Sequence, residues 1–415
     1  MSENSYQKID KTAWSANLTV MSTILDQFAP ETIGERLRIA REEARETQAA
    51  AAAAAGIART TLVSIEQGQR KVRLDELLKL VRHYGTTVNA LLRNEAAHGD
   101  LLPKFRQQIS ISAKTPIDTA AELLSHLAKA ETELEALLGI HRIKNFPQQR
   151  PILPGDVRAQ AEQDAGDVRA WLGLGSGPII DLVPILDFQM GVRVFLRALD
   201  RSISGLYAYD DAIGACVLIN ANHPRSRRNH TAAHELGHLV TSRGNADVLQ
   251  DGSPEQARDE RYANAFAAAF LIPSRPIMQR FHEITAGSQH FSRRHVVVLA
   301  HAFAVSREAM VRRLEDLKLV KTGTWDWFVQ HGNITDAQAK QVLGEASFAD
   351  VYESRPMPPT SLRLNQLAAD VWHRDLLSEG QLARLLRIDR VALREILDGL
   401  DDEVAETDPV LALHG

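Results

Sequence analysis

The chain has 415 residues, of which 44% are hydrophobic and 24% charged, and its formal net charge is −5. This composition is ordinary for a globular protein of two or three domains and excludes a disordered chain. Its apolar stretches are too short to span a membrane, and its acidic balance argues against a protein that coats nucleic acid throughout. The single cysteine, Cys216, excludes an internal disulfide. A metal site would therefore use histidines and carboxylates.

The first residues, MSENSYQKIDKTAW, lack the basic-then-apolar pattern of a secretory signal. We therefore expect a cytoplasmic protein without membrane association. Residues 1–29 are polar and weakly periodic, which predicts a flexible tail. Residues 30–97 show the apolar periodicity of helices and are punctuated by Gly56, Gly68 and Gly85. This pattern predicts a compact domain of five short helices.

Residues 98–150 are expected to form a linker that contains one helix. Apolar residues between Ile117 and Leu138 fall on one helical stripe. The stripe fits a connecting helix packed on a neighbouring domain, or a coiled coil between two copies of the chain. Because the stripe is short, we favour the connecting helix.

Residues 151–330 combine helical and strand-like patterns, with Gly205 and Gly214 expected in turns between strands. Three runs predict strands: Val192–Leu196, Leu206–Tyr209 and Cys216–Ile219. Residues 331–415 predict a C-terminal helical region with an acidic tail. The expected fold is therefore mainly α with a small β-sheet, of the α+β class.

The strongest local signal is the pentapeptide His234-Glu235-Leu236-Gly237-His238. Residues four apart on a helix share a face, so both imidazoles can reach one metal ion while Glu235 addresses its bound water. A helix that carries two histidines for unrelated reasons is the alternative. A third ligand is expected from a later helix. Glu260 is the best candidate, since small residues follow it, and Glu255 and Asp259 compete with it.

Four features of residues 157–273 point to one family: the Ser204-Gly205 turn, the strand ending in Ile219-Asn220, the segment Thr231–Leu239, and the block Glu260–Ala267 leading to Leu271-Ile272-Pro273. With these features the sequence resembles the ImmA/IrrE family of zinc metallopeptidases. The resemblance implies a zincin-like fold that holds Zn²⁺ by His234, His238 and Glu260. It also implies Glu235 as the general base of amide hydrolysis, with a specific repressor or antitoxin-like protein as substrate.

One position departs from this family. Asn229-His230 stands where the family usually has an Arg-Phe pair. His230 is one helical turn before His234, so it could join the site or cap the helix, and we favour the cap.

Residues 30–92 contain a second motif, carried by Ile33–Arg38, Arg41, Thr47-Gln48, Gly56–Leu62 and Ile65–Gly68. This spacing resembles the helix-turn-helix of the XRE (Cro/C1-type repressor) family, which implies binding to a double-stranded DNA operator. Thr47 would cap the second helix and leave Gln48 free to contact a phosphate. The helix from about Arg59 to Gln67 would enter the major groove and present Arg59, Thr60, Thr61 and Ser64.

The charge of residues 31–93 supports this interpretation, with 11 Lys and Arg against 8 Asp and Glu. So small an excess predicts weak binding by a monomer and tighter binding by a homodimer. A helical bundle that binds protein is the alternative. Two later segments, Leu299–Leu314 and Leu382–Leu397, also have a helix-turn-helix pattern, and we expect them to serve packing or assembly.

Together the motifs predict a DNA-binding regulator joined to a zinc endopeptidase that processes a specific regulator in stress, prophage or toxin–antitoxin control. One alternative is a transcription factor whose peptidase-like domain only senses a ligand or metal. Another is a purely structural or interaction protein.

Overall fold

The computed structural model describes residues 29–86, 91, 101–105, 115–244, 246–250, 257–354 and 360–400. The chain divides into two compact units, residues 1–96 and 97–415, and each is described by itself. Nearly all of the tail predicted at residues 1–29, and the acidic C-terminal end, lie outside the described residues. In the described part of the chain, no helix has both the length and the apolarity that crossing a membrane requires.

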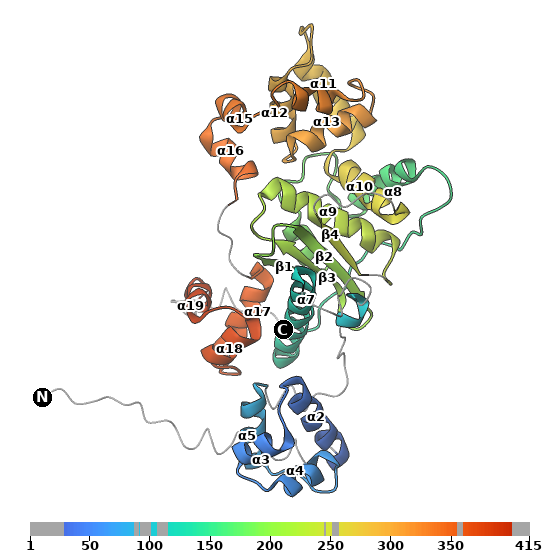
Figure 1. Ribbon diagram of the computed structural model, residues 1–415. Helices are drawn as coiled ribbons and strands as arrows, with labels where there is room; N and C mark the ends of the chain where they lie inside the picture. Colours follow the sequence, from blue (N-terminus) through green and yellow to red (C-terminus); the bar gives the residue numbers. More distant parts are fainter. Residues whose placement is uncertain are drawn as a thin grey trace, which may run out of the picture. The chain divides into compact units, whose positions relative to one another are not determined.

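The N-terminal unit is a small helical bundle. Its described helices are α2 (Pro30–Glu43), α3 (Gln48–Ala55), α4 (Arg59–Glu66) and α5 (Leu74–Tyr84) (Figure 1). Leu37, Leu62 and Leu77 are fully buried between them. The fifth helix predicted for this unit lies outside the described residues.

The run of alanines forms helix α3. Alanine has the highest helix propensity, and Thr47 caps the helix by accepting a hydrogen bond at Oγ1 from Ala50 N at 3.2 Å. Ala51, Ala52 and Ala55 are buried. Because these side chains are small, α3 can pack closely on α4 and α5. The run is therefore a core helix.

The second unit is built around a four-stranded sheet of order β1-β3-β2-β4. The strands are β1 (Arg193–Arg197), β2 (Ile203–Asp210), β3 (Gly214–Asn220) and β4 (Asp247–Gln250). β1 is parallel to β3, and the other pairs are antiparallel. The predicted turn at Ser204-Gly205 was wrong: both residues lie within β2, where a bulge interrupts the pairing with β4. The predicted strands did not include β4.

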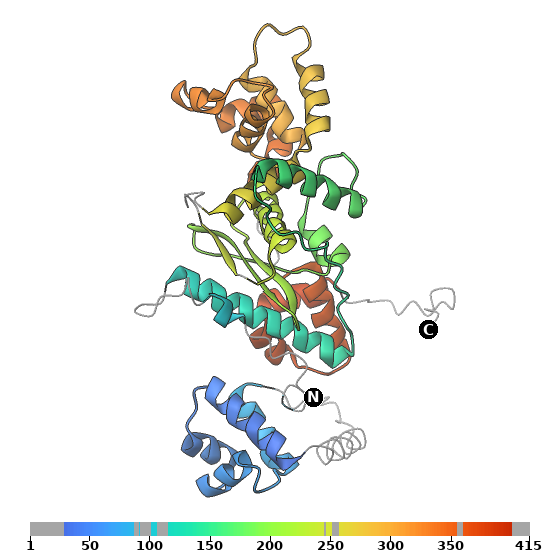
Figure 2. The same ribbon diagram turned by 90° about the vertical axis from the view of Figure 1, so that its right-hand side faces the viewer.

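Helices cover both faces of this sheet (Figure 2). One face packs on α9 (Arg225–Thr241), which lies against α10 (Arg258–Leu271), and α10 against α8 (Val157–Trp171). The other face packs on α7 (Pro116–Leu138). Along β3, Val217 contributes to the core beside α9, and Leu218 to the core beside α7. The chain thus has the mainly α fold with a small sheet that the sequence predicts.

The apolar stripe of α7 is buried within the chain. Leu124, Leu127 and Ala128 pack in one core with the sheet and with α17 (Leu362–His373). This is the packing expected of a connecting helix on a neighbour. The stripe is not available for the coiled coil that was the alternative.

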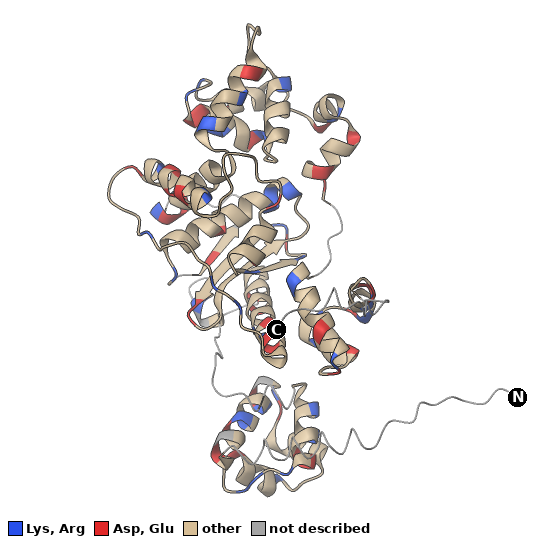
Figure 3. Cartoon of the chain, turned by 180° about the vertical axis from the view of Figure 1, so that it is seen from behind, with Lys and Arg blue, Asp and Glu red and all other residues tan. Residues whose placement is uncertain are grey.

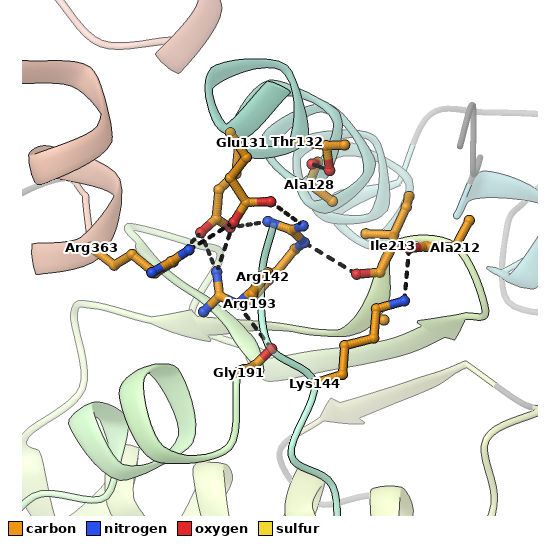
Figure 4. A network of polar contacts seen from close by, with 12 residues as sticks. Ala128, Glu131, Thr132, Arg142, Lys144, Gly191, Arg193, Ala212, Ile213 and Arg363 are labelled. Atoms are coloured by element: carbon orange, nitrogen blue, oxygen red, sulfur yellow. Dashed lines mark hydrogen bonds and ion pairs between the residues drawn. The ribbon is translucent and has the colours of Figure 1, made fainter. Parts of the chain in front are cut away.

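A buried ionic network joins α7 to the sheet and to α17 (Figure 4). It consists of three carboxylates and three guanidinium groups: Glu131, Glu135, Asp187, Arg142, Arg193 and Arg363. Arg193 Nη1 lies 3.1 Å from Glu131 Oε2, and its Nη2 lies 2.7 Å from Glu135 Oε2. Arg363 Nη2 lies 3.1 Å from Glu135 Oε1. Three positive groups therefore balance three negative ones.

The remaining elements are mostly short helices. They are η1 (Leu102–Phe105), η2 (Ile185–Gln189), α11 (Ser274–Thr285), α12 (Arg293–Ala302), α13 (Arg307–Asp316), α14 (Thr324–Gln330), α15 (Asp336–Leu343), α16 (Glu345–Tyr352), α18 (Glu379–Leu386) and α19 (Arg390–Asp398). Charged side chains of both signs are scattered over these helices, whereas the sheet carries few (Figure 3).

Helices α12–α13 and α18–α19 repeat the turn that joins α3 to α4. One residue of each turn has a left-handed conformation, with φ of 71° at Gly56, 53° at Ala304 and 49° at Arg387. In each case the next residue's amide donates to a carbonyl five residues back, at 3.0 Å. Both later segments are thus helix-turn-helix pairs, as their sequence pattern predicts.

Candidate functional site

Helix α9 carries the two predicted imidazoles and is buried for most of its length. His234 and Glu235 are fully buried, and 6% of His238 is exposed. Gly237 lets α10 lie close to this helix, because a Cβ there would lie 3.0 Å from the Cα of Ala263. Small residues at this contact therefore bring the two helices together.

The imidazoles of His234 and His238 face each other and Glu260. Their Nε2 atoms are 3.1 Å apart, and each lies 3.4 Å from one carboxylate oxygen of Glu260. His234 Nδ1 donates to the Oδ1 of Asn264 at 2.9 Å, which leaves the Nε2 lone pair for a cation. The structure thus brings together the three predicted ligands.

Asp247, the first residue of β4, joins this group. Its Oδ2 lies 3.4 Å from His238 Nε2 and 3.9 Å from His234 Nε2. The ligand atoms of the four residues all lie within 4.8 Å of one another. Asp247 was not predicted from the sequence, because a four-residue strand has too few positions to show alternation.

The two competitors of Glu260 have different outcomes. Asp259 is exposed and is not part of the cluster. Its Oδ1 accepts a hydrogen bond from the backbone amide of Glu260. Glu255 lies outside the described residues.

The carboxylate of Glu235 has no hydrogen-bond partner among the described residues. Burial, followed by the nearby Asp247 and Glu260, raises its pKa well above the usual value. Gly205 leaves room for it, since a Cβ there would lie 3.2 Å from Glu235 Oε1 and 2.5 Å from Thr231 Cγ2. Proton transfer would use such an unpartnered base.

His230 neither caps α9 nor belongs to the four-residue cluster. The helix begins at Arg225, so His230 lies in its interior, and the prediction of a cap was wrong. Burial lowers the pKa of His230 to about 4, helped by His234 and Arg227. A neutral imidazole at this position is the result.

The donor set fits a divalent cation. Two imidazole nitrogens and two carboxylates converge, and no lysine or arginine pairs with the two carboxylates among the described residues. Tetrahedral zinc with bonds of about 2.0–2.1 Å places its ligand atoms about 3.3–3.4 Å apart. The nitrogen–nitrogen and nitrogen–oxygen separations of 3.1–3.9 Å in this cluster bracket that spacing.

In the N-terminal unit, Gln48 is not free as predicted. Its Nε2 donates to Glu66 Oε2 at 2.9 Å, and Glu66 also pairs with Arg41 Nε at 2.7 Å. This set joins α2, α3 and α4 at a buried carboxylate. Gln48 therefore has a structural contact, and any phosphate contact would use its other amide hydrogen.

The predicted base-reading residues lie along α4. Arg59 and Thr60 are exposed, whereas Thr61 and Ser64 are half-buried. Ser64 Oγ donates to the carbonyl of Thr60 at 3.0 Å. Beyond the helix, Arg70 pairs with Glu76. This pairing reduces the positive charge available to a DNA backbone.

Comparison with known families agrees with both motifs. Residues 32–93 match the helix-turn-helix domain, and residues 189–315 match the IrrE N-terminal-like domain of the M78 peptidases. The chain therefore carries a helix-turn-helix DNA-binding domain and an IrrE-like peptidase-family domain, which confirms the two resemblances. The second match includes α9 and α10, and it ends before α14. No curated protein matches the chain.

Proposed function

We propose that this protein is a DNA-binding transcriptional regulator with a zinc-dependent endopeptidase that cleaves one specific regulator protein. The convergence of His234, His238 and Glu260 beside the unpartnered Glu235 carries this proposal. A domain that only senses a metal needs the three ligands. It has less need of a buried acid next to the first ligand, because an unpaired buried carboxylate costs stability.

Each residue would have a separate task. His234, His238 and Glu260 would hold zinc, which when bound lowers the pKa of water and polarises a carbonyl. Glu235 would accept a proton from that water and pass it to the leaving amine. Asn264 would keep the His234 ring in one tautomer and orientation.

The edge of the sheet is consistent with a protein as the substrate. β4 is an edge strand, and in the described sheet it pairs only with β2. An extended segment of a substrate could add to such an edge by backbone hydrogen bonds. A repressor or antitoxin-like protein with a flexible segment would fit, and operator binding by a homodimer would place two such sites at one promoter.

The peptidase is tested by Glu235→Gln in the full chain. We expect the variant to bind zinc as the wild type does and to lose processing of its substrate. New protein termini in cells, measured by mass spectrometry, would report that loss, and Asp259→Asn, at an exposed neighbour of Glu260, serves as the control. If Glu235→Gln keeps zinc, every wild-type cleavage and all regulatory output, the domain is a sensor.

The DNA-binding half is tested on operator sites identified by mapping the protein on chromosomal DNA in cells. Arg59→Ala combined with Thr61→Ala should weaken operator affinity at least about tenfold. Arg82→Ala, an exposed change on α5, should have a smaller effect. Unchanged affinity of the double variant would refute the assignment of α4 as the recognition helix.

A further inference from the structure

We propose that Asp247 is a fourth protein ligand of the metal and keeps the resting peptidase latent. Catalytic zinc sites usually have three protein ligands and one open position for water. Here Asp247 would hold that fourth position until it is displaced. This inference rests on the metal centre of the proposed function and adds a form of regulation to it.

The carboxylates of Asp247 and Glu260 lie at similar distances from the two imidazole nitrogens. Both Nε2 atoms lie 3.4 Å from Glu260, and Asp247 Oδ2 lies 3.4 Å from one and 3.9 Å from the other. Three of these four distances match the ligand spacing of about 3.3–3.4 Å around tetrahedral zinc, and the fourth, from Asp247 to His234, is 3.9 Å. Glu235 is nearby but does not belong to this cluster. Asp247, not Glu235, therefore meets the distance requirement of a ligand.

Charge and hydrogen bonding agree with this assignment. The Oδ2 atom of Asp247 is buried and has no hydrogen-bond partner among the described residues. Two neutral imidazoles and two carboxylates would make a divalent metal site neutral, whereas three ligands would leave one positive charge. A buried neutral site costs less desolvation energy than a buried charged one.

The position of Asp247 makes it the ligand that can leave. His234 and His238 are fixed on a buried helix, whereas Asp247 opens an edge strand. The side chains of Asp247 and Glu260 are 23% and 26% exposed, whereas the two imidazoles are almost fully buried. Glu260 lies on α10, which packs on α9, so the edge-strand position is what distinguishes Asp247. Rotation of the Asp247 side chain toward solvent would open one coordination position without moving α9 or α10.

The full chain loaded with Co²⁺ tests this proposal, with acetohydroxamate as the probe of an open position. We expect the wild-type absorption spectrum to change little on addition of acetohydroxamate. Asp247→Ala should alter the spectrum of the bound metal and bind acetohydroxamate at least about tenfold more tightly. Zinc affinity, measured by chelator competition, should fall by about 10–100-fold, the scale on which ligand-supporting residues act. Asp259→Ala should behave as the wild type.

Equal acetohydroxamate binding and equal zinc affinity in the wild type and Asp247→Ala would overturn the proposal. If Asp247→Ala fails to fold, Asp247→Asn gives the same comparison, because it keeps the shape and removes the charge. His234→Ala separates this inference from the metal centre itself. If His234→Ala loses the metal and Asp247→Ala behaves as the wild type, only the proposal of a latent state is refuted. If His234→Ala keeps the metal, the proposed metal centre itself is refuted.

Discussion

Two buried groups of charged residues lie on opposite faces of the same sheet and differ in how far their positive and negative side chains balance. The ionic network beside α7 pairs three carboxylates with three arginines. The cluster beside α9 holds Asp247, Glu260 and the neighbouring Glu235 with two imidazoles, and no arginine or lysine pairs with these acids among the described residues. Buried charge must be neutralised by an opposite charge or a proton, so the first group is complete as it stands, whereas the second fits a divalent cation.

The largest stability change is expected in the ionic network. Glu131→Ala removes a buried carboxylate that pairs with Arg142 and Arg193, and so leaves three guanidinium groups against two carboxylates. The free energy of unfolding should fall by about 3–5 kcal/mol, measured by chemical denaturation. Glu283→Ala, which removes an exposed ion pair with Arg280, should cost at most about 1 kcal/mol. A loss at Glu131 no larger than at Glu283 would show that the network is not structural.

At the metal cluster, by contrast, a substitution is expected to raise the free energy of unfolding. Glu235→Gln replaces an unpartnered buried acid by a neutral amide, and should stabilise the metal-free protein at pH values where the unfolded chain ionises Glu235. The raised pKa of Glu235 means that the folded state keeps a proton that the unfolded state releases. Stability should therefore fall as pH rises from about 4.5 through the raised pKa.

Denaturation of chelator-treated protein at several pH values measures this difference. Glu235→Gln should show a weaker loss of stability with rising pH than the wild type. A variant less stable than the wild type across this range would contradict the assignment of Glu235 as an uncompensated acid.

A smaller effect on stability is expected at Gly205, whose missing side chain leaves room for Glu235. Gly205→Ala would place a Cβ 2.5 Å from Thr231 Cγ2 and 3.2 Å from Glu235 Oε1. We expect a loss of about 1–2 kcal/mol, reduced substrate processing and unchanged zinc content. Gly244→Ala, where a Cβ would meet nothing within 4 Å, is the matched control. Full processing by Gly205→Ala would show that Glu235 does not need this space.

The smallest effect is expected where α7 meets α18. His126 Nε2 lies 2.9 Å from the Leu385 carbonyl oxygen, and burial, followed by Arg387, lowers the pKa of His126. Below pH 6.5 the unfolded chain gains a proton that the folded chain does not, so stability should fall as pH drops toward the lowered pKa. His126→Gln keeps a donor and should remove up to about 1.4 kcal/mol per pH unit of this dependence. An unchanged dependence of stability on pH would contradict the assignment of His126 as a group whose pKa is lowered by folding.

The sequence predicted the features that depend on neighbouring residues. The spacing of His234 and His238 follows from helical periodicity, and the turns at Gly56, Ala304 and Arg387 follow from short local patterns. Glu260 was predicted because the family resemblance and the small residues after it both pointed to its helix.

Features that join distant segments were missed. Asp247 reaches the cluster only because β4 pairs with β2, whose residues lie about forty positions earlier in the chain. The ionic network joins Glu135 to Arg363 across 228 positions. No local periodicity encodes such pairs, because they depend on packing of the whole unit.

Zinc content of the purified full-length protein tests the contrast between the two buried groups most directly. Elemental analysis should find one zinc per chain in the wild type and in His282→Ala, a change at an exposed histidine on α11. It should find none in His234→Ala. Absence of zinc from the wild type loaded with excess metal, or full retention in His234→Ala, would contradict the account.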